Sequence, residues 1–265
     1  MDGKQKNADR FTGFADIYEN ARPMVPQYPI NVICSYLGKK PDTVVDLGCG
    51  TGLSSRAWKN TAGNIIGIEP SIDMINIARC KQSENMKFIQ AFSDKTTLPD
   101  NCADVVVCSQ SFHWMEPKAT LKEVNRILKG NGVFAAVDCD WPPVTLRQAE
   151  KAYMTLYSKV KEIEKSSKFI KDTFVHYSKD KHLKNINDSG YFTYTREILF
   201  ANTEKCTAER FINIILSQGS LQTILKNSPE LIEADTEQFK TYINNLFGKQ
   251  EFDIDFCYRM RIGIK

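Results

Sequence analysis

The chain has 265 residues, a formal net charge of +3, 42% hydrophobic residues and 25% charged residues, as is ordinary for a globular protein long enough to bury a full core. So small a net charge gives no support for a nucleic-acid-binding or membrane-binding protein. No apolar run approaches the roughly 20 residues of a membrane span, and the polar start MDGKQKNADR lacks the apolar core of a secretion signal, so the sequence predicts a cytoplasmic location.

The amino-terminal segment, residues 1–40, carries an aromatic stripe ahead of a short helix. Phe11, Phe14 and Tyr18 stand at helical spacing. Three prolines within residues 19–29 then prevent a continuous helix. A helix predicted over residues 30–37 would lead into the first strand of an α/β core, residues 41–140.

Residues 43–58 (TVVDLGCGTGLSSRAW) are typical of a strand, a turn and a helix. The apolar run 43–47, interrupted by Asp46, suits a buried parallel strand, and a helix is predicted to open at Leu53. Between them stand three alternating glycines, Gly48, Gly50 and Gly52. Glycine lets a ligand approach the main chain closely, and a helix start offers free N–H groups and partial positive charge. The turn therefore predicts a ligand with a polar or anionic end.

The spacing of the glycines and an acid on the second strand narrow the class of ligand. A dinucleotide fingerprint requires G-x-G-x-x-G, but the third glycine comes one residue early and Leu53 takes its position. The second strand, residues 64–68, ends at Glu69, whose carboxylate can accept both hydroxyls of a ribose. D-L-G-C-G-T-G followed by I-I-G-I-E resembles the first two motifs of the class I S-adenosylmethionine-dependent methyltransferases.

This resemblance implies S-adenosylmethionine as the cofactor and assigns roles around the turn. Asp46 would organise the methionine tail through the backbone of the turn or a water, and Glu69 would bind the ribose. Pro70 and Ile72 would border the adenine and the ribose. Asp94 lies four residues before Leu98, where the family places its adenine-contacting acid. Its carboxylate would accept from the adenine amino group while the backbone N–H of Lys95 serves a ring nitrogen; the alternative is a loop aspartate in a local turn.

The fourth predicted strand begins at Asp104, after a short third strand at residues 87–90. Ligands of open α/β sheets lie at the carboxyl ends of the strands, so Ser109 and Gln110 are expected beside the methionine part. His113 follows and has the chemistry of a general base, although it equally suits a pocket wall. Trp114 is placed on the substrate side.

Two stretches are similar to the trans-aconitate methyltransferase-like branch of the family. They are the pattern F-x-x-F-A-x-x-Y-x-x-x-R-P-x-x-P of residues 11–26 and the doublet His113-Trp114. The branch resemblance implies that the amino-terminal segment folds over the cofactor as a lid, with Tyr18 and Arg22 near it and Arg22 facing the methionine carboxylate. The alternative is a packing helix with a solvated arginine.

The remaining chain is predicted to cover and complete the sheet. A helix at residues 119–128 and a turn at 129–132 precede the fifth strand, 133–137. Asp140 and Trp141 leave this strand and either face the substrate or lie in a partly exposed loop. Residues 141–190 are predicted to form a helical cap, because the family builds its substrate cover after the fifth strand. Residues 191–265 would supply the rest, with strands at 191–200 and 252–264 and helices at 207–225 and 235–247.

These patterns predict an α/β fold: a doubly wound, seven-stranded, mostly parallel sheet of the Rossmann-like methyltransferase type, with the last strand antiparallel and a helical cap after the fifth strand. The implied function is methyl transfer from S-adenosylmethionine to a small molecule, and the branch resemblance implies a carboxylic acid methylated on oxygen. The sulfonium already activates the methyl group, so the protein has to align the reactants and exclude water. No metal site is predicted, since the eight cysteines form no C-x-x-C pair and no histidine stands at zinc spacing from them.

Three other functions stay open at this point. An NAD(P)-dependent oxidoreductase shares the strand, turn and helix but is disfavoured by Leu53 and Asp94. A non-catalytic S-adenosylmethionine-binding protein would keep Glu69 and Asp94. A methyltransferase acting on tRNA requires a basic face, which the near-neutral composition does not support. The predicted partner is therefore a small-molecule acceptor, with no nucleic acid and no membrane, and the oligomeric state is left open.

Overall fold

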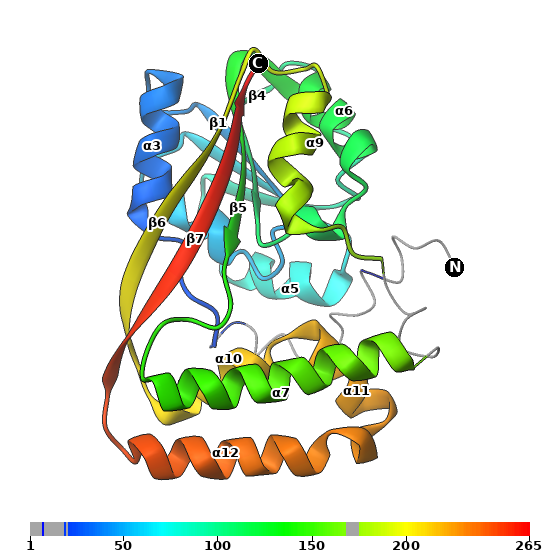
Figure 1. The fold of residues 1–265 in the computed structure, drawn as a ribbon. Helices are drawn as coiled ribbons and strands as arrows, with labels where there is room; N and C mark the ends of the chain where they lie inside the picture. Colours follow the sequence, from blue (N-terminus) through cyan, green and yellow to red (C-terminus); the bar gives the residue numbers. More distant parts are fainter. Residues whose placement is uncertain (1–6, 8–18, 20, 168–174) are drawn as a thin grey trace. The chain divides into compact units, whose positions relative to one another are not determined.

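The computed structural model describes residues 7, 19, 21–167 and 175–265 (Figure 1). By their contacts they form two units. We call the first the sheet unit: residues 24–139, 176–200 and 258–265. The second, the helical unit, contains residues 140–175 and 201–257 with the segment before residue 24. Strands β6 (Tyr194–Cys206) and β7 (Phe252–Ile264) contribute residues to both units.

Seven strands form one sheet in the order β3-β2-β1-β4-β5-β7-β6. The first five strands are β1 (Thr43–Leu47), β2 (Asn64–Glu69), β3 (Met86–Gln90), β4 (Ala103–Ser109) and β5 (Leu128–Cys139). They pair in parallel, whereas β7 pairs antiparallel with β5, so that Val133 lies opposite Ile264. The predicted seven-stranded, mostly parallel sheet with an antiparallel last strand is confirmed. The order reverses between β1 and β4, where open α/β sheets bind their ligands.

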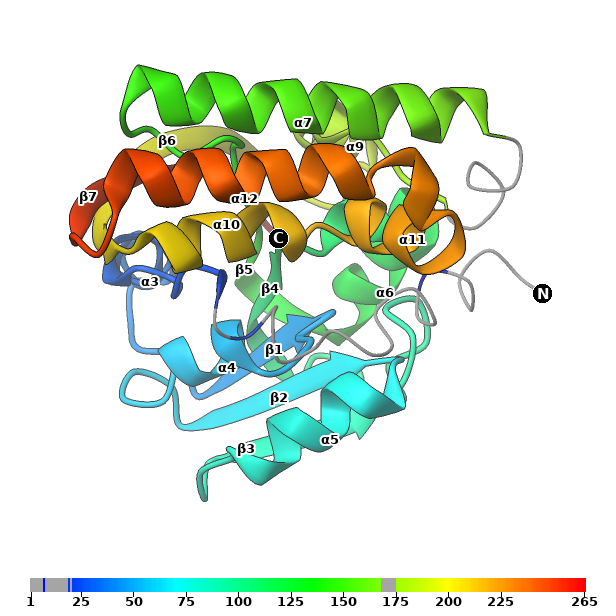
Figure 2. The same cartoon turned by 90° about the horizontal axis from the view of Figure 1, so that it is seen from below.

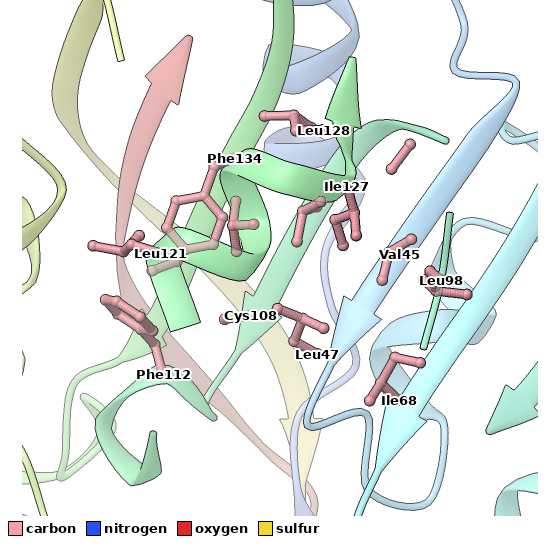
Figure 3. Packing of buried hydrophobic residues seen from close by; sticks show 14 of the residues in the cluster. Val45, Leu47, Ile68, Leu98, Cys108, Phe112, Leu121, Ile127, Leu128 and Phe134 are labelled. Carbon is pink, nitrogen blue, oxygen red and sulfur yellow. The ribbon is translucent and has the colours of Figure 1, made fainter. Parts of the chain in front are cut away.

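Helices cover both faces of the sheet unit, which explains why its central strands are apolar throughout (Figure 1). Successive residues of β4 alternate between the faces. Cys108 belongs to a buried cluster with side chains of α6 (Pro117–Ile127) and α9 (His182–Asp188). Its neighbour Ser109 faces α3 (Gln27–Leu37) and α4 (Leu53–Ala57). Figure 3 shows side chains of β1, β4, β5 and α6 gathered in the buried cluster.

Local signals fix the ends of several helices. The helix α3 stops at Gly38, whose φ of 76° is left-handed and whose N–H donates to Cys34 O at 2.9 Å. Helix α5 (Ile72–Cys80) buries Met74, Ile75 and Ala78, as its apolar spacing predicts. At the start of α6 the Glu116 carboxylate accepts the N–H groups of residues 118 and 119. Short 3-10 helices form η1 (Phe112–Trp114), η2 (Lys179–Lys181) and η3 (Pro229–Leu231).

The predicted turn before the fifth strand is a bulge within β5. Ala103 of β4 pairs with Leu128, and Val105 pairs with Val133, so residues 129–132 are looped out of the ladder. Asn131 takes a φ of 61° in this bulge. Four residues of β5 thus lie opposite the single residue Asp104 of β4, which interrupts the ladder at this point.

The helical unit contains α7 (Arg147–Ser166), α10 (Ala208–Leu216), α11 (Gly219–Asn227) and α12 (Glu233–Phe247), shown from below in Figure 2. The prediction of one helix over residues 207–225 was wrong. Thr207 caps α10 by accepting the N–H of Arg210, and the chain breaks at Ser217 before α11 begins at Gly219. Gly219 lowers the preference for continuing the helix. No helix in the described part of the chain is long and apolar enough to cross a bilayer.

The predicted sixth strand was misplaced. It begins at Tyr194 rather than residue 191 and continues to Cys206. It lies at the edge of the sheet, and most of its residues are exposed or half-buried. An edge strand carries polar residues on both faces. The alternation of apolar and polar residues therefore covers only part of the strand and does not mark its ends.

Candidate functional site

The glycine turn after β1 is closed on one side and open on the other. All three glycines have left-handed backbones, with φ of 68° at Gly48, 55° at Gly50 and 83° at Gly52. A Cβ at Gly48 would lie 2.6 Å from the Cβ of Ser111, whose hydroxyl donates to Leu47 O at 2.6 Å. A Cβ at Gly50 would meet nothing within 4 Å. Ser111 therefore fills the inner side of the turn, and the main chain at Gly50 borders open space.

Glu69 joins the glycine turn to the end of β2. Its Oε2 accepts the N–H of Gly50 at 3.0 Å and its Oε1 accepts the N–H of Ser71 at 2.9 Å. Burial raises the pKa of this carboxyl to about 7, although the two N–H groups oppose the rise. The acid predicted to bind the ribose thus lies beside the glycine turn, at the carboxyl edge of the sheet.

Asp46 lies beneath the turn and holds the start of α4. Its Oδ2 accepts the hydroxyls of Ser54 and Ser55, both at 2.6 Å. Its Oδ1 is buried and has no hydrogen-bond partner among the described residues. Burial raises the pKa of Asp46 to about 6, against the two hydroxyl donors. Helix α4 itself spans only Leu53–Ala57, so its dipole is short and the turn offers a ligand mainly its backbone.

The residues predicted to contact adenine lie on two neighbouring loops. Asp94 and Lys95 lie in the turn 92–95, where the N–H of Lys95 donates to Phe92 O at 3.1 Å. The N–H that the sequence assigns to an adenine nitrogen therefore closes the turn. After β2, Pro70 O accepts from the Gln90 side chain at 3.1 Å, and Ile72 is 46% exposed.

At the end of β4 the backbone is strained. Gln110 has a φ of 55°, and its N–H donates to Val137 O of β5 at 2.8 Å. Its Oε1 accepts from Lys179 Nζ at 3.0 Å. A left-handed non-glycine residue costs of order 1–3 kcal/mol and is a feature of functional sites. Ser109 beside it borders a small apolar pocket, together with Ile30, Ile33, Trp58, Val107 and Val137.

Another buried carboxylate, Asp138, stands at the end of β5 among cations and imidazoles. Lys179 Nζ lies 3.2 Å from Oδ1, and Arg261 Nη1 donates to Oδ2 at 3.0 Å. His113 Nδ1 is 3.5 Å from Oδ1, and His182 Nε2 is 3.6 Å from Oδ2. Burial acts to raise the pKa of Asp138, but Lys179 and the two imidazoles hold it well below its usual range.

The imidazoles of this cluster are weak bases. Burial lowers the pKa of His113 to about 3, despite the opposing effect of Asp138. Burial likewise lowers the pKa of His182 to about 4. The third histidine, His176, is exposed, and its ring centroid is 5.1 Å from those of both His113 and Trp114. The ring centroids of Trp114 and His113 are 4.8 Å apart, so the residue predicted on the substrate side lies against the predicted base.

The other predicted site residues belong to the helical unit or fall outside the described residues. The guanidinium of Arg22 lies 4.8 Å from the ring centroid of Trp141, and its Nη2 donates to Ser217 O at 3.0 Å. The N–H of Asp140 donates to Cys257 O at 2.8 Å. Tyr18 lies outside the described residues.

Sequence reasoning missed Ser111 and the partners of Asp138. Ser111 follows the predicted strand by two residues, and no spacing rule marks it as the residue that packs against Gly48. Asp138 did carry a signal, because a carboxylate at the end of the apolar run VFAAV needs a buried partner. Its partners Lys179, His182 and Arg261 come from distant parts of the chain, so no local pattern identifies them.

Comparison with known proteins shows that part of the chain is similar to methyltransferases. Residues 45–136 match the family described as "Methyltransferase domain". The chain is 30% identical over 124 residues to a probable S-adenosylmethionine-dependent methyltransferase of Saccharomyces cerevisiae, covering 44% of this chain and 43% of that protein. It is 31% identical over 128 residues to an uncharacterised methyltransferase of Schizosaccharomyces pombe, covering 48% and 50%. The matches thus span about half the length of these relatives.

Solved structures share the fold. A candidate type II methyltransferase from Anaeromyxobacter dehalogenans superposes with a TM-score of 0.69 over 92% of this chain and 97% of that one, at 14% identity. A candidate methyltransferase of an antibiotic biosynthesis pathway in Anabaena variabilis gives 0.60 over 90% and 98%, at 17% identity. Residues 45–136 therefore match a methyltransferase domain, and the chain has the Rossmann-like methyltransferase fold.

Proposed function

We propose that the protein transfers a methyl group from S-adenosylmethionine to a small-molecule acceptor. The observation that carries this proposal is the link between Glu69 and the glycine turn. Within the matched domain, one carboxylate binds the N–H of Gly50 and the N–H of Ser71, and so holds the ends of β1 and β2 together at the sheet's carboxyl edge. The dinucleotide alternative is disfavoured because Leu53 takes the place of its third glycine.

The described residues fit this cofactor. The open side of Gly50 leaves the main chain accessible to a methionine end, and the Asp46 Oδ1 and Gln110 Nε2 atoms are buried without hydrogen-bond partners in the described chain. Ser109 and Gln110 would hold the methionine part, and Glu69 with Pro70 and Ile72 the ribose and adenine. Asp94 would take the adenine amino group. Arg22 and Tyr18 as a lid, and Lys95 as a donor to adenine, stay predictions from the sequence.

Bound S-adenosylmethionine supplies a methyl group already activated by its sulfonium. The chain therefore has to bind, orient and exclude water rather than transfer protons. Gln110 is suited to orienting, because its backbone is fixed to Val137 of β5 and its side chain to Lys179. Trp114 and the ring of His113, packed together at the end of β4, would line the acceptor side.

The basicity of His113 favours one class of acceptor. A carboxylic acid has a pKa of about 4 and is ionised at neutral pH, so it attacks a methyl group without a base. A hydroxyl acceptor needs a base of pKa near the working pH. His113, with a pKa lowered to about 3 by burial, is far too weak for that task. This supports the carboxylic acid acceptor that the trans-aconitate methyltransferase-like resemblance implies.

A labelled-methyl assay tests the proposal. The purified full chain is incubated with S-adenosylmethionine carrying a labelled methyl group and with panels of small carboxylic acids, alcohols, amines and thiols. We expect label in base-labile methyl esters from the acid panel and none from the alcohols. Binding of the cofactor with no transfer to any panel would favour a non-catalytic binding protein. Transfer only to alcohols would refute the carboxylic acid class.

A further inference from the structure

We propose that His113, Asp138 and His182 form a binding site for a divalent transition-metal ion such as Zn²⁺. The site lies in the sheet unit and goes beyond the proposed methyl transfer, which needs no metal. It joins the short helix η1 after β4, the end of β5 and the first residue of α9.

The spacing of the donor atoms suits a metal shell. One donor atom from each residue lies within 4.8 Å of the others. His113 Nδ1 is 3.5 Å from Asp138 Oδ1, and His182 Nε2 is 3.6 Å from Asp138 Oδ2. Metal bonds of about 2.0–2.2 Å at tetrahedral angles separate neighbouring ligand atoms by about 3.3 Å. The separation of His113 Nδ1 from Oδ1 therefore lies within a few tenths of an ångström of tetrahedral spacing, whereas His182 Nε2 has that spacing to the other oxygen, Oδ2.

The imidazole nitrogens of the cluster are buried without the hydrogen bonds that buried polar atoms require. The side chains of His113, Asp138 and His182 are 9%, 2% and 0% exposed. His113 Nδ1 and both ring nitrogens of His182 lack a hydrogen-bond partner in the part of the chain that the structure describes, whereas Asp138 Oδ1 is ion-paired with Lys179. Buried polar atoms of native proteins are satisfied in the great majority of cases, by protein, water or an ion. One ion between these side chains would bind both imidazoles at once.

The ligand types also suit a metal, which binds neutral imidazole and ionised carboxylate groups. Two imidazoles and a carboxylate are a ligand set that zinc accepts, with a fourth position left for water. Cysteine spacing in the sequence gave no hint of this set, because residues 113, 138 and 182 come from three separate elements.

Two protein cations stand beside Asp138, and only one of them competes with a metal. Arg261 binds Asp138 Oδ2, but its Nε also donates to Glu197 Oε2 at 2.7 Å, so its charge is shared by a second carboxylate. Lys179 Nζ lies 3.2 Å from Oδ1, the oxygen that faces His113. Its side chain is 25% exposed and can withdraw toward solvent. A metal would therefore replace the Lys179 ammonium, exchanging one cation for another at Oδ1.

Zinc binding to the full chain tests the site. The chain is first treated with a chelator and then titrated with ZnCl₂ in a calorimeter. We expect one ion per chain with a Kd of about 10 µM or lower. His182→Ala should lower the affinity by about 100-fold or more, because it removes one of three protein ligands. His176→Ala is the matched control, because His176 touches the ring of His113 but is not a ligand, and it should keep the affinity.

Lys179→Met provides a second test, which distinguishes a metal site from a cluster that only stabilises the fold. It removes no metal ligand, so it can be used even if a ligand variant fails to fold. Removing the competing ammonium should tighten zinc binding by about ten-fold, the effect of about 1.4 kcal/mol. Co²⁺ bound to the wild-type chain should show the visible absorption of a tetrahedral ion, and His182→Ala should lose it. No binding by either the wild type or Lys179→Met would overturn the proposal. Equal affinities of His182→Ala and His176→Ala would also overturn it, since the ion would then be elsewhere.

Discussion

The carboxyl edge of the sheet holds buried carboxylates in two opposite environments. At the ends of β1 and β2, Asp46 and Glu69 receive hydrogen bonds from hydroxyl and N–H groups, and burial raises their pKa values to about 6 and about 7. At the end of β5, Asp138 lies next to Lys179 and Arg261, and its pKa is held well below the usual range. Neutral donors do not offset the loss of water around a carboxylate here, whereas cations do.

This difference separates the proposed cofactor region, where the carboxylates have only neutral donors, from the Asp138 cluster, where cations of the chain compensate the charge. Ionised Asp46 and Glu69 are destabilised in the folded chain, so ribose hydroxyls that donate to Glu69 would relieve a deficit already present. Asp138 has its charge compensated by residues from β7 and from the segment before α9, and so ties these elements to β5. The following predictions test this contrast.

Asp138→Asn should produce a larger loss of stability than Asp46→Asn. Removing the carboxylate leaves Lys179 without its buried counter-charge and Arg261 with Glu197 alone, which costs up to about 3 kcal/mol of unfolding free energy, the lower end for a broken buried pair. Asp46→Asn keeps an oxygen for both serine hydroxyls and should not lower the unfolding free energy by more than about 1.5 kcal/mol. Urea unfolding at pH 7 measures both. Equal losses in the two variants would remove the distinction.

Gly48→Ala and Gly50→Ala should differ because only one of them meets a neighbour. Both force alanine into a left-handed backbone, at about 1–2 kcal/mol. At Gly48 the new methyl also overlaps Ser111, which adds about 1–3 kcal/mol. Thermal and urea unfolding should rank Gly48→Ala as the less stable variant. Cofactor affinity should fall for Gly50→Ala although its fold is less disturbed. The opposite stability order would mean that Ser111 does not support the turn.

The stability contributed by Asp46 should be lost as pH rises. Its folded pKa of about 6 lies above the unfolded value of about 3.9, so the contribution is fully present below pH 4 and lost as pH passes through 6. The change is at most about 3 kcal/mol. For Asp138 the sign is reversed, and its contribution is lost as pH falls below about 4. Urea unfolding of the wild type and of Asp46→Asn at pH 4, 5, 6 and 7 measures the unfolding free energy of each. The difference between the two free energies should change as pH rises, and a constant difference would contradict the raised pKa.

His113→Gln should have the smallest effect on methyl transfer to an ionised acid. Loss of a general base typically costs 10²- to 10⁴-fold, whereas we expect less than about ten-fold in kcat/KM and an unchanged pH profile, because a carboxylate needs no deprotonation. Steady-state kinetics between pH 6 and 9 provides the measurement. A drop of a thousand-fold would restore His113 as the base.

Much of the fold could be predicted because its signals are local. The β1 strand, the turn glycines and the strand ending at Glu69 follow from a few neighbouring residues, and β7 spans the predicted residues 252–264. The helix broken near Ser217 and the extended edge strand β6 were missed because burial, rather than propensity, decides where such elements end. The division into lid, core, cap and carboxyl-terminal part, like the cytoplasmic location, stays a prediction.

In the candidate site, too, residues close in the sequence could be predicted and residues far apart in it could not. Asp46, Glu69 and the glycines stand within 24 residues of one another, so spacing alone brought them together. The Asp138 cluster draws its members from residues 113, 138, 179, 182 and 261, and only the packing of β5, β7 and α9 makes them neighbours. The contact of Lys95 with adenine stays a prediction, and its N–H donates to Phe92 O within its own turn.

Calorimetry with S-adenosylmethionine and with NAD is the most direct test of the proposed cofactor. The wild-type chain should bind S-adenosylmethionine and not NAD. Glu69→Ala and Asp94→Ala should each weaken binding by about ten-fold or more, the effect of a lost charged hydrogen bond. Glu84→Ala, at an exposed glutamate between α5 and β3, should leave the affinity unchanged. Binding of NAD alone, or unchanged affinity in both site variants, would contradict a cofactor seated at the Glu69–Gly50 turn.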